Sequence, residues 1–206
     1  MLRWARGVLG VLVAAAAVGG PVAYYRATYA HAKRLRVVTD GTLYRSGQLT
    51  ADGFRDAVRR FGIKTVVNLQ EEARDPRIPE RWQSARFTTE STVCRELGVR
   101  YVPLDGGVLD DPGREPGGQP KVIDDFYAVM NDRANYPVLI HCKAGLHRTG
   151  LIAAVYRMEY EGRTPEQALR ELKANGFGTF AATDGNEYLK RFIFAYRPTP
   201  RPEGGK

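Results

Sequence analysis

The sequence predicts an α/β domain with a central, mostly parallel sheet flanked by helices, and a transmembrane helix before it. Short apolar runs of strand length occur at residues 63–69, 100–104 and 137–140. Segments with helical spacing alternate with these runs, and this alternation favours a parallel sheet. A run of nineteen uncharged residues, 7–25, is about long enough to cross a bilayer.

Local signals place the individual helices. Apolar residues at helical spacing followed by Gly62 predict a helix over 50–61, and a similar pattern marks 121–133. Thr164-Pro-Glu-Gln167 forms a capping box with proline at the first helical position, and the helix should end near Asn175. Further helices are expected over 84–97 and 186–196, and loops over 71–81 and 105–120.

The chain divides into four parts on this interpretation. Residues 1–25 form a membrane anchor or signal segment, and 26–40 form a basic juxtamembrane linker. Residues 41–197 form the folded domain, and 198–206 form a disordered tail rich in proline and glycine.

The net charge of +8 is concentrated at the N-terminus. Residues 1–36 hold six basic residues and no acidic one, which leaves +2 for the other 170 residues. A nearly neutral domain is not typical of a protein that binds the phosphate backbone, so no nucleic-acid partner is expected. Basic residues that flank an apolar run instead indicate a membrane.

Three interpretations of the apolar segment remain open: a retained single-pass anchor, which we favour, a cleaved secretory signal, or a buried helix. The second flank carries four basic residues against two arginines and the amino terminus on the first. The positive-inside rule therefore favours a cytoplasmic domain, and signal cleavage would instead give a secreted or periplasmic one.

The two cysteines and three histidines are too few for a disulfide framework or a credible metal cluster, so neither a metal nor a cofactor is expected. Cys94 lies in a helical stretch and is interpreted as a packing residue. A bridge between Cys94 and Cys142 would block the thiol of Cys142, which favours a reducing compartment.

The most informative segment is His141-Cys-Lys-Ala-Gly-Leu-His-Arg-Thr-Gly150. It joins an apolar strand to a helix, so its backbone N–H groups and the helix dipole should converge on one anion. Cys142 at its base should form a thiolate easily, because the dipole and Arg148 favour that form. Arg148 can make two parallel bonds to a phosphate, and Thr149 could donate a hydrogen bond to the sulfur. This pattern predicts a cysteine nucleophile that attacks phosphorus.

The segment from His141 to Thr149 resembles the active-site loop of cysteine-dependent protein tyrosine and dual-specificity phosphatases. The likeness extends from about residue 43 to about 196. Leu43-Tyr-Arg-Ser-Gly-Gln48 and the strand that follows Gly62 are similar to the atypical dual-specificity phosphatases of plants and fungi and their bacterial relatives. The resemblance implies a phosphocysteine intermediate and no metal. It gives His141 and Thr149 supporting roles and makes Lys143, Ala144, Gly145, Leu146 and His147 the phosphate-binding residues.

The resemblance also implies a general acid, an aspartate in a loop after a core strand. Asp105 directly follows the strand at 100–104, as in several relatives. Asp110 and Asp111 instead have the spacing to the cysteine that compact members show. We favour Asp105 and keep Asp110 and Asp111 as alternatives.

Side chains in the loop indicate which class of substrate the protein acts on. Lys143 and His147 add groups that are, or can become, positive, but Leu146 stands where the related inositol phosphatases have lysine. This difference favours a phosphotyrosine or dual-specificity protein phosphatase acting on a phosphorylated protein or a small phosphorylated substrate. The alternatives are an inositol phosphate or phosphoinositide phosphatase and an inactive phospho-binding module. Arg45 and Gln48 either line the mouth of the site or pin a turn.

Overall fold

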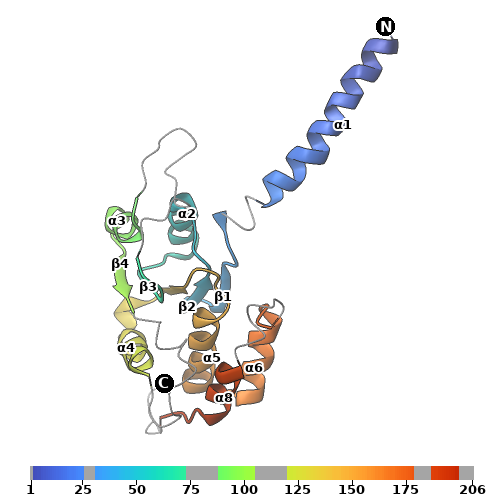
Figure 1. Ribbon diagram of the computed structural model, residues 1–206. Coiled ribbons are helices and arrows are strands. Elements are labelled where there is room, and N and C mark those ends of the chain that lie inside the picture. The colour runs from blue at the N-terminus through green and yellow to red at the C-terminus, as the bar shows by residue number, and fades with distance from the viewer. Residues whose placement is uncertain (1, 26–30, 73–87, 105–119, 179–186, 200–206) are drawn as a thin grey trace.

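The fold is seen in a computed structural model, which describes residues 2–25, 31–72, 88–104, 120–178 and 187–199 (Figure 1). Its five strands are β1 (Arg36–Thr39), β2 (Leu43–Ser46), β3 (Thr65–Asn68), β4 (Arg100–Pro103) and β5 (Val138–His141). They form one sheet in the order β1-β2-β5-β3-β4. Only the β1–β2 pair is antiparallel, so the mostly parallel sheet is confirmed.

The helices agree with the local signals. They are α2 (Ala51–Phe61), α3 (Glu90–Glu96), α4 (Lys121–Met130), the short 3₁₀ helix η3 (Arg133–Asn135), α5 (Arg148–Glu161), α6 (Pro165–Ala174) and α8 (Glu187–Ala195). Gly62 ends α2 in the left-handed conformation, and the capping box at Thr164 begins α6. Helix α3 begins later than predicted, because Thr89 is extended and caps it with its side chain.

Two apolar layers cover the two faces of the sheet. Neighbouring residues of a strand point to opposite faces, so Val138 and Ile140 enter one core and Leu139 enters the other. Helices α4, α5, α6 and α8 pack on the first face, and α2 and α3 pack on the second (Figure 1). Strand β5 is buried on both faces, which places the residues after it at the centre of the molecule.

The predicted linker, residues 26–40, is wrong at its C-terminal end. Residues 36–39 form β1, which pairs with β2 along Arg36↔Arg45 and Val37↔Tyr44. Residues 31–35 contact the domain as well, through a hydrogen bond from the Gly47 N–H to the Lys33 carbonyl of 2.8 Å. Only Val38 of this short strand is buried and its apolar run is two residues long, so the basic residues suggested a linker.

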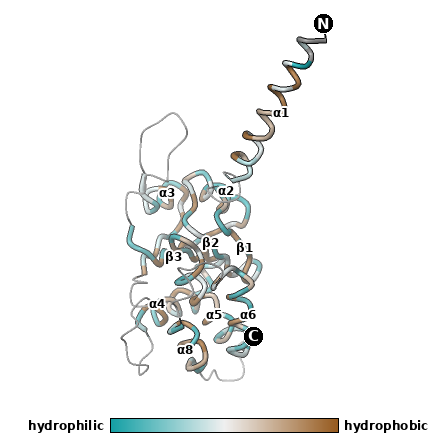
Figure 2. Tube along the Cα trace, turned by 45° about the vertical axis from the view of Figure 1, so that its right-hand side comes forward, coloured by the Kyte–Doolittle hydropathy of each residue, from teal (hydrophilic) through white to brown (hydrophobic). Residues whose placement is uncertain are grey.

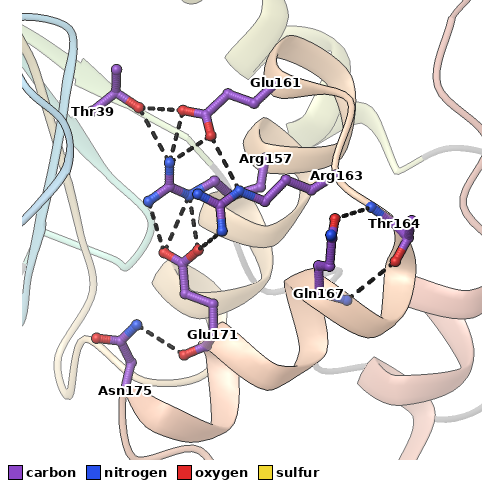
Figure 3. A network of polar contacts seen from close by, with 8 residues as sticks. All are labelled: Thr39, Arg157, Glu161, Arg163, Thr164, Gln167, Glu171 and Asn175. Carbon is purple, nitrogen blue, oxygen red and sulfur yellow. Dashed lines mark hydrogen bonds and ion pairs between the residues drawn. The ribbon is translucent and has the colours of Figure 1, made fainter.

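A charged network fixes α6 against α5 and β1 (Figure 3). Arg157 of α5 lies 2.6 Å from Glu161 and 2.9 Å from Glu171 of α6, and Glu161 also accepts a hydrogen bond from Thr39 of β1. Burial tends to raise the pKa of Glu161, but the hydrogen bonds from Thr39 and Arg157 outweigh it and lower that pKa. The network therefore links α5, α6 and β1 through charged and polar side chains.

The first helix, α1 (Leu2–Tyr25), stands apart from the sheet (Figure 1). Within Arg6–Tyr25 an 18-residue window has a mean hydropathy of 1.8, and none of that window is buried. Figure 2 shows its apolar residues along the tube, away from the apolar interior of the domain. Among the described residues, α1 is thus long and apolar enough to cross a membrane, as predicted from residues 7–25.

Candidate active site

The predicted catalytic loop lies at the carboxyl edge of the parallel strands. Ser46, His141 and Asn68 end β2, β5 and β3 and are paired in register. The chain segments that follow these strands therefore leave from the same edge, which is where open α/β sheets bind ligands. Cys142 is the first residue after the central strand, and α5 begins six residues later at Arg148.

Three consecutive carbonyl groups of the loop accept hydrogen bonds from residues that lie outside the loop. The Lys143 carbonyl accepts from the backbone N–H of Gln48 at 3.2 Å, and the Ala144 carbonyl accepts from Arg34 Nη1 at 2.9 Å. The Gly145 carbonyl accepts from Arg45 Nη2, also at 2.9 Å. These contacts fix the orientation of three neighbouring peptide planes.

The orientation of the carbonyls determines where the N–H groups point. In a trans peptide unit the C=O and the following N–H point in opposite directions. The N–H groups of Ala144, Gly145 and Leu146 are therefore turned to the inner side of the loop. The N–H of Gly145 donates to Cys142 Sγ at 3.3 Å, which shows that this inner side is the side of the thiol. The loop can thus surround an anion at Cys142 with backbone donors.

Gly145 allows this arrangement because of its conformation and its surroundings. Its φ is +72°, in the left-handed region that favours glycine. A Cβ at this position would lie 2.5 Å from Gly47 N and 2.7 Å from Ser46 C. Both atoms belong to the backbone, so no side-chain rotation would relieve the overlap.

Arg45 holds the loop that carries Cys142, a role that neither of the two interpretations predicted. Its side chain is buried and its guanidinium is held by the Gly145 carbonyl. Burial, helped by the charge of the nearby Arg36, lowers the pKa of Arg45 to about 10. The guanidinium still carries its charge at neutral pH, on the outer side of the loop below the phosphate site.

Arg148 and Thr149 begin helix α5. The half-buried Arg148 donates from Nη1 to the carbonyl of Leu69 at 3.2 Å, so the end of β3 orients its guanidinium. Thr149 is fully buried, and its hydroxyl has no hydrogen-bond partner among the described residues. The predicted bond from Thr149 to the sulfur is therefore not formed here, and the sulfur accepts the Gly145 N–H instead.

A buried polar chain next to Cys142 was not predicted. His141 Nε2 hydrogen-bonds to Glu90 of α3, and the other oxygen of Glu90 accepts from Gln48 Nε2 at 2.9 Å. Gln70 in turn donates to Gln48. His141 and Glu90 are buried, so this chain ties the residue before Cys142 to helix α3. In the sequence Glu90 looks like any acidic residue in the first turn of a helix.

The two cysteines differ as predicted. Both are free thiols, and Cys94 is packed in the core between α2, α3 and the sheet. Burial, together with the charge of Glu90, raises the pKa of the Cys94 thiol to about 12. Cys94 is therefore an inert packing residue.

The remaining side chains of the loop have different surroundings. Lys143 is exposed, whereas Leu146 is buried and a Cβ on Gly176 would lie 3.4 Å from its Cδ2. The ring of His147 lies edge-on to Phe177, with centroids 5.9 Å apart. The three candidate general acids, Asp105, Asp110 and Asp111, lie outside the described residues.

A comparison with protein families agrees with this geometry. Residues 25–188 match the family described as a DSP-PTPase phosphatase fused to NAD+ kinase. The chain belongs to this family. It is a cysteine-dependent phosphatase of the tyrosine and dual-specificity type, as its resemblance to that superfamily predicted.

Individual relatives are similar over most of the domain. The dual specificity protein phosphatase TpbA of Pseudomonas aeruginosa is 27% identical over 186 residues, which cover 86% of this chain and 75% of TpbA. The inositol diphosphatase DSP3 of Arabidopsis thaliana is 27% identical over 122 residues, which cover 59% of this chain and 52% of DSP3.

Two solved structures show the same fold. The crystal structure of TpbA has a TM-score of 0.53 and 25% identity, with coverage of 79% of this chain and 89% of that one. The catalytic core of the PP-IP phosphatase Siw14 of Saccharomyces cerevisiae has a TM-score of 0.56 and 20% identity, with coverage of 81% and 87%.

Proposed function

We propose that this protein hydrolyses phosphate monoesters of tyrosine, or of tyrosine and serine or threonine, through a phosphocysteine intermediate. The observation that carries the proposal is the loop itself. Three of its carbonyls accept hydrogen bonds from residues outside the loop, which fixes three peptide units, and the N–H of one of these units, that of Gly145, donates to Cys142 Sγ. Donors fixed in this way can stabilise the charge that develops on the phosphoryl oxygens without having to reorganise.

The proposed reaction has two displacements at phosphorus. The Cys142 thiolate forms an S–P bond while the bond to the ester oxygen breaks, and the leaving oxygen receives a proton from the general acid. Water then attacks the phosphocysteine, the S–P bond breaks, and inorganic phosphate leaves with the thiolate restored. Arg148 can hold two phosphoryl oxygens in both steps, because its planar guanidinium matches them.

The loop favours a phosphoprotein over a highly anionic small molecule. Leu146 is buried beside Gly176, so this position supplies an apolar group where an inositol phosphatase has a lysine. The likeness to TpbA, named as a protein phosphatase, supports the same choice. The likeness to DSP3 keeps inositol phosphates as the alternative substrate class.

Turnover of a substrate panel tests the proposal. The reduced full-length protein in detergent should hydrolyse an aryl phosphate and phosphotyrosine peptides, and vanadate should inhibit both reactions. Faster turnover of inositol pyrophosphates or phosphoinositides than of phosphopeptides would support the alternative. No turnover of any substrate between pH 5 and 7 by folded, reduced protein would leave only a phospho-binding module.

Asp105 is proposed as the general acid. Leu104 donates from its N–H to the Asn68 carbonyl at 2.8 Å, so the chain leaves β4 at the same edge of the sheet as Cys142. Replacing the true acid with asparagine should slow hydrolysis of a phenyl phosphate by about 10²- to 10⁴-fold. An ester with a good leaving group should be affected far less. Asp105→Asn, Asp110→Asn and Asp111→Asn serve as controls for one another, and wild-type rates in all three would contradict the assignment.

We further propose that α1 anchors the protein in a membrane with the catalytic domain in the cytoplasm. Its exposed apolar surface and the basic residues after it support this arrangement. The full-length protein should then stay with membranes in alkaline carbonate. Release of a shortened, soluble product would instead support a cleaved signal.

A further inference from the structure

Part of the predicted linker reaches the catalytic loop. We call residues 31–35 the brace segment. Its His31 Nε2 hydrogen-bonds to Asp56 of α2 at 2.6 Å, and the Lys33 carbonyl accepts from the Gly47 N–H at 2.8 Å. Arg34 Nη1 donates to the Ala144 carbonyl at 2.9 Å. The brace segment thus contacts α2, the turn after β2 and the phosphate loop.

The brace segment fits closely against these neighbours. A Cβ on Gly53 would lie only 2.0 Å from the His31 carbonyl oxygen, and one on Gly47 would lie 2.9 Å from Lys33 Cδ. Arg34 itself has a φ of 51°, an uncommon conformation for a residue with a side chain. Such a conformation persists where the surroundings determine it. The position of the Arg34 side chain is therefore set by the domain.

The bond that Arg34 makes acts on one peptide unit of the loop. That unit carries the Ala144 carbonyl on one side and the Gly145 N–H on the other, and this N–H donates to Cys142 Sγ at 3.3 Å. A charged donor on the carbonyl holds the plane in place and polarises the amide, which strengthens the N–H as a donor. The effect of Arg34 therefore passes through a single peptide to the sulfur.

We propose that Arg34 is a positioning residue for the phosphate loop, and that the brace segment thereby makes the catalytic site depend on the membrane-proximal chain. This inference rests on the proposed function. Arg34 lies nine residues after Tyr25, the end of α1. The six steps from Tyr25 to His31 can span at most about 21 Å, so the loop must work close to the end of the membrane helix.

Three variants of the full-length protein test the role of Arg34. Arg34→Ala should lower kcat/KM for an aryl phosphate by roughly tenfold or more, since a hydrogen bond from a charged group is lost. The inhibition constant for vanadate should rise by a similar factor, because vanadate occupies the same donors. Arg34→Lys keeps a charged donor and should recover part of both losses.

Arg36→Ala is the matched control. Arg36 lies two residues later and hydrogen-bonds to Asn175 rather than to the loop. This variant should keep both constants within about twofold of wild type, a range set by ordinary surface changes. A flexible insertion within residues 26–30 should also leave the aryl phosphatase activity unchanged, because it lengthens the tether without moving the brace segment.

The possible outcomes separate the positioning role from the proposed function. If vanadate slows the alkylation of Cys142, the site binds an anion, and this measurement does not depend on turnover. If the wild type is protected but turns over no substrate, the proposed function fails, and loss of protection in Arg34→Ala would still support the brace. If Arg34→Ala retains wild-type kcat/KM and vanadate inhibition, the positioning role is overturned and the proposed function stands. An equal loss in Arg34→Ala and Arg36→Ala would also overturn it.

Discussion

Replacing Cys142 with serine is expected to abolish phosphatase activity, lowering kcat by about 10⁴-fold or more. A serine hydroxyl stays protonated under conditions in which a thiolate forms, and the described surroundings of Sγ offer a donor, the Gly145 N–H, rather than a base. The loop carbonyls remain held by Gln48, Arg34 and Arg45, so the variant should still bind phosphate or vanadate. Steady-state hydrolysis of an aryl phosphate and vanadate binding by calorimetry give the two readings.

Cys94→Ala provides the control for this substitution. Cys94 is buried and the pKa of its thiol is raised to about 12, so it should contribute nothing to turnover. Iodoacetamide at neutral pH should label the wild type at Cys142 alone, and Cys142→Ser should not be labelled. Activity retained in Cys142→Ser, or lost in Cys94→Ala without loss of folding, would contradict the assignment of the nucleophile.

The parts of the fold that the sequence predicted are those encoded by local patterns. The capping box at Thr164 and the glycine stop at Gly62 depend on neighbours within a few residues, and both occur as expected. Strand β1 was missed because it has only four residues, of which Val37 and Val38 alone are apolar, and it pairs along one edge only. Its position is determined by pairing with β2, which no local pattern reports.

The residues of the site also fall into two groups, those predicted from a local pattern and those placed by tertiary packing. Cys142 and Arg148 could be predicted because their spacing alone brings them to one loop. Arg34 and Glu90 could not, since they reach that loop from 110 and 51 residues away through hydrogen bonds that depend on tertiary packing. Arg34 was counted only as one of the basic residues beside the membrane segment.

Gly145→Ala is expected to combine a large loss of activity with a loss of stability. The left-handed φ of +72° costs an alanine about 1–2 kcal/mol. The added Cβ would also lie 2.5 Å from Gly47 N, and the backbone must shift to relieve this overlap. Together these effects should lower the free energy of unfolding by roughly 2–4 kcal/mol. Because the same shift turns the Gly145 N–H away from the sulfur, kcat/KM should fall by about 10²-fold.

Gly62→Ala separates the effect of the left-handed backbone conformation from that of the steric overlap. Gly62 has almost the same φ, +63°, but a Cβ there would meet no atom within 4 Å. This variant should lose about 1–2 kcal/mol of stability from the backbone conformation alone and keep its kcat/KM. Urea unfolding and aryl phosphate kinetics measure both quantities in both variants. If Gly145→Ala matched Gly62→Ala in stability and retained activity, the close approach of the loop to the turn after β2 would not constrain catalysis. A selective loss in Gly145→Ala would show that this contact holds the donors in place.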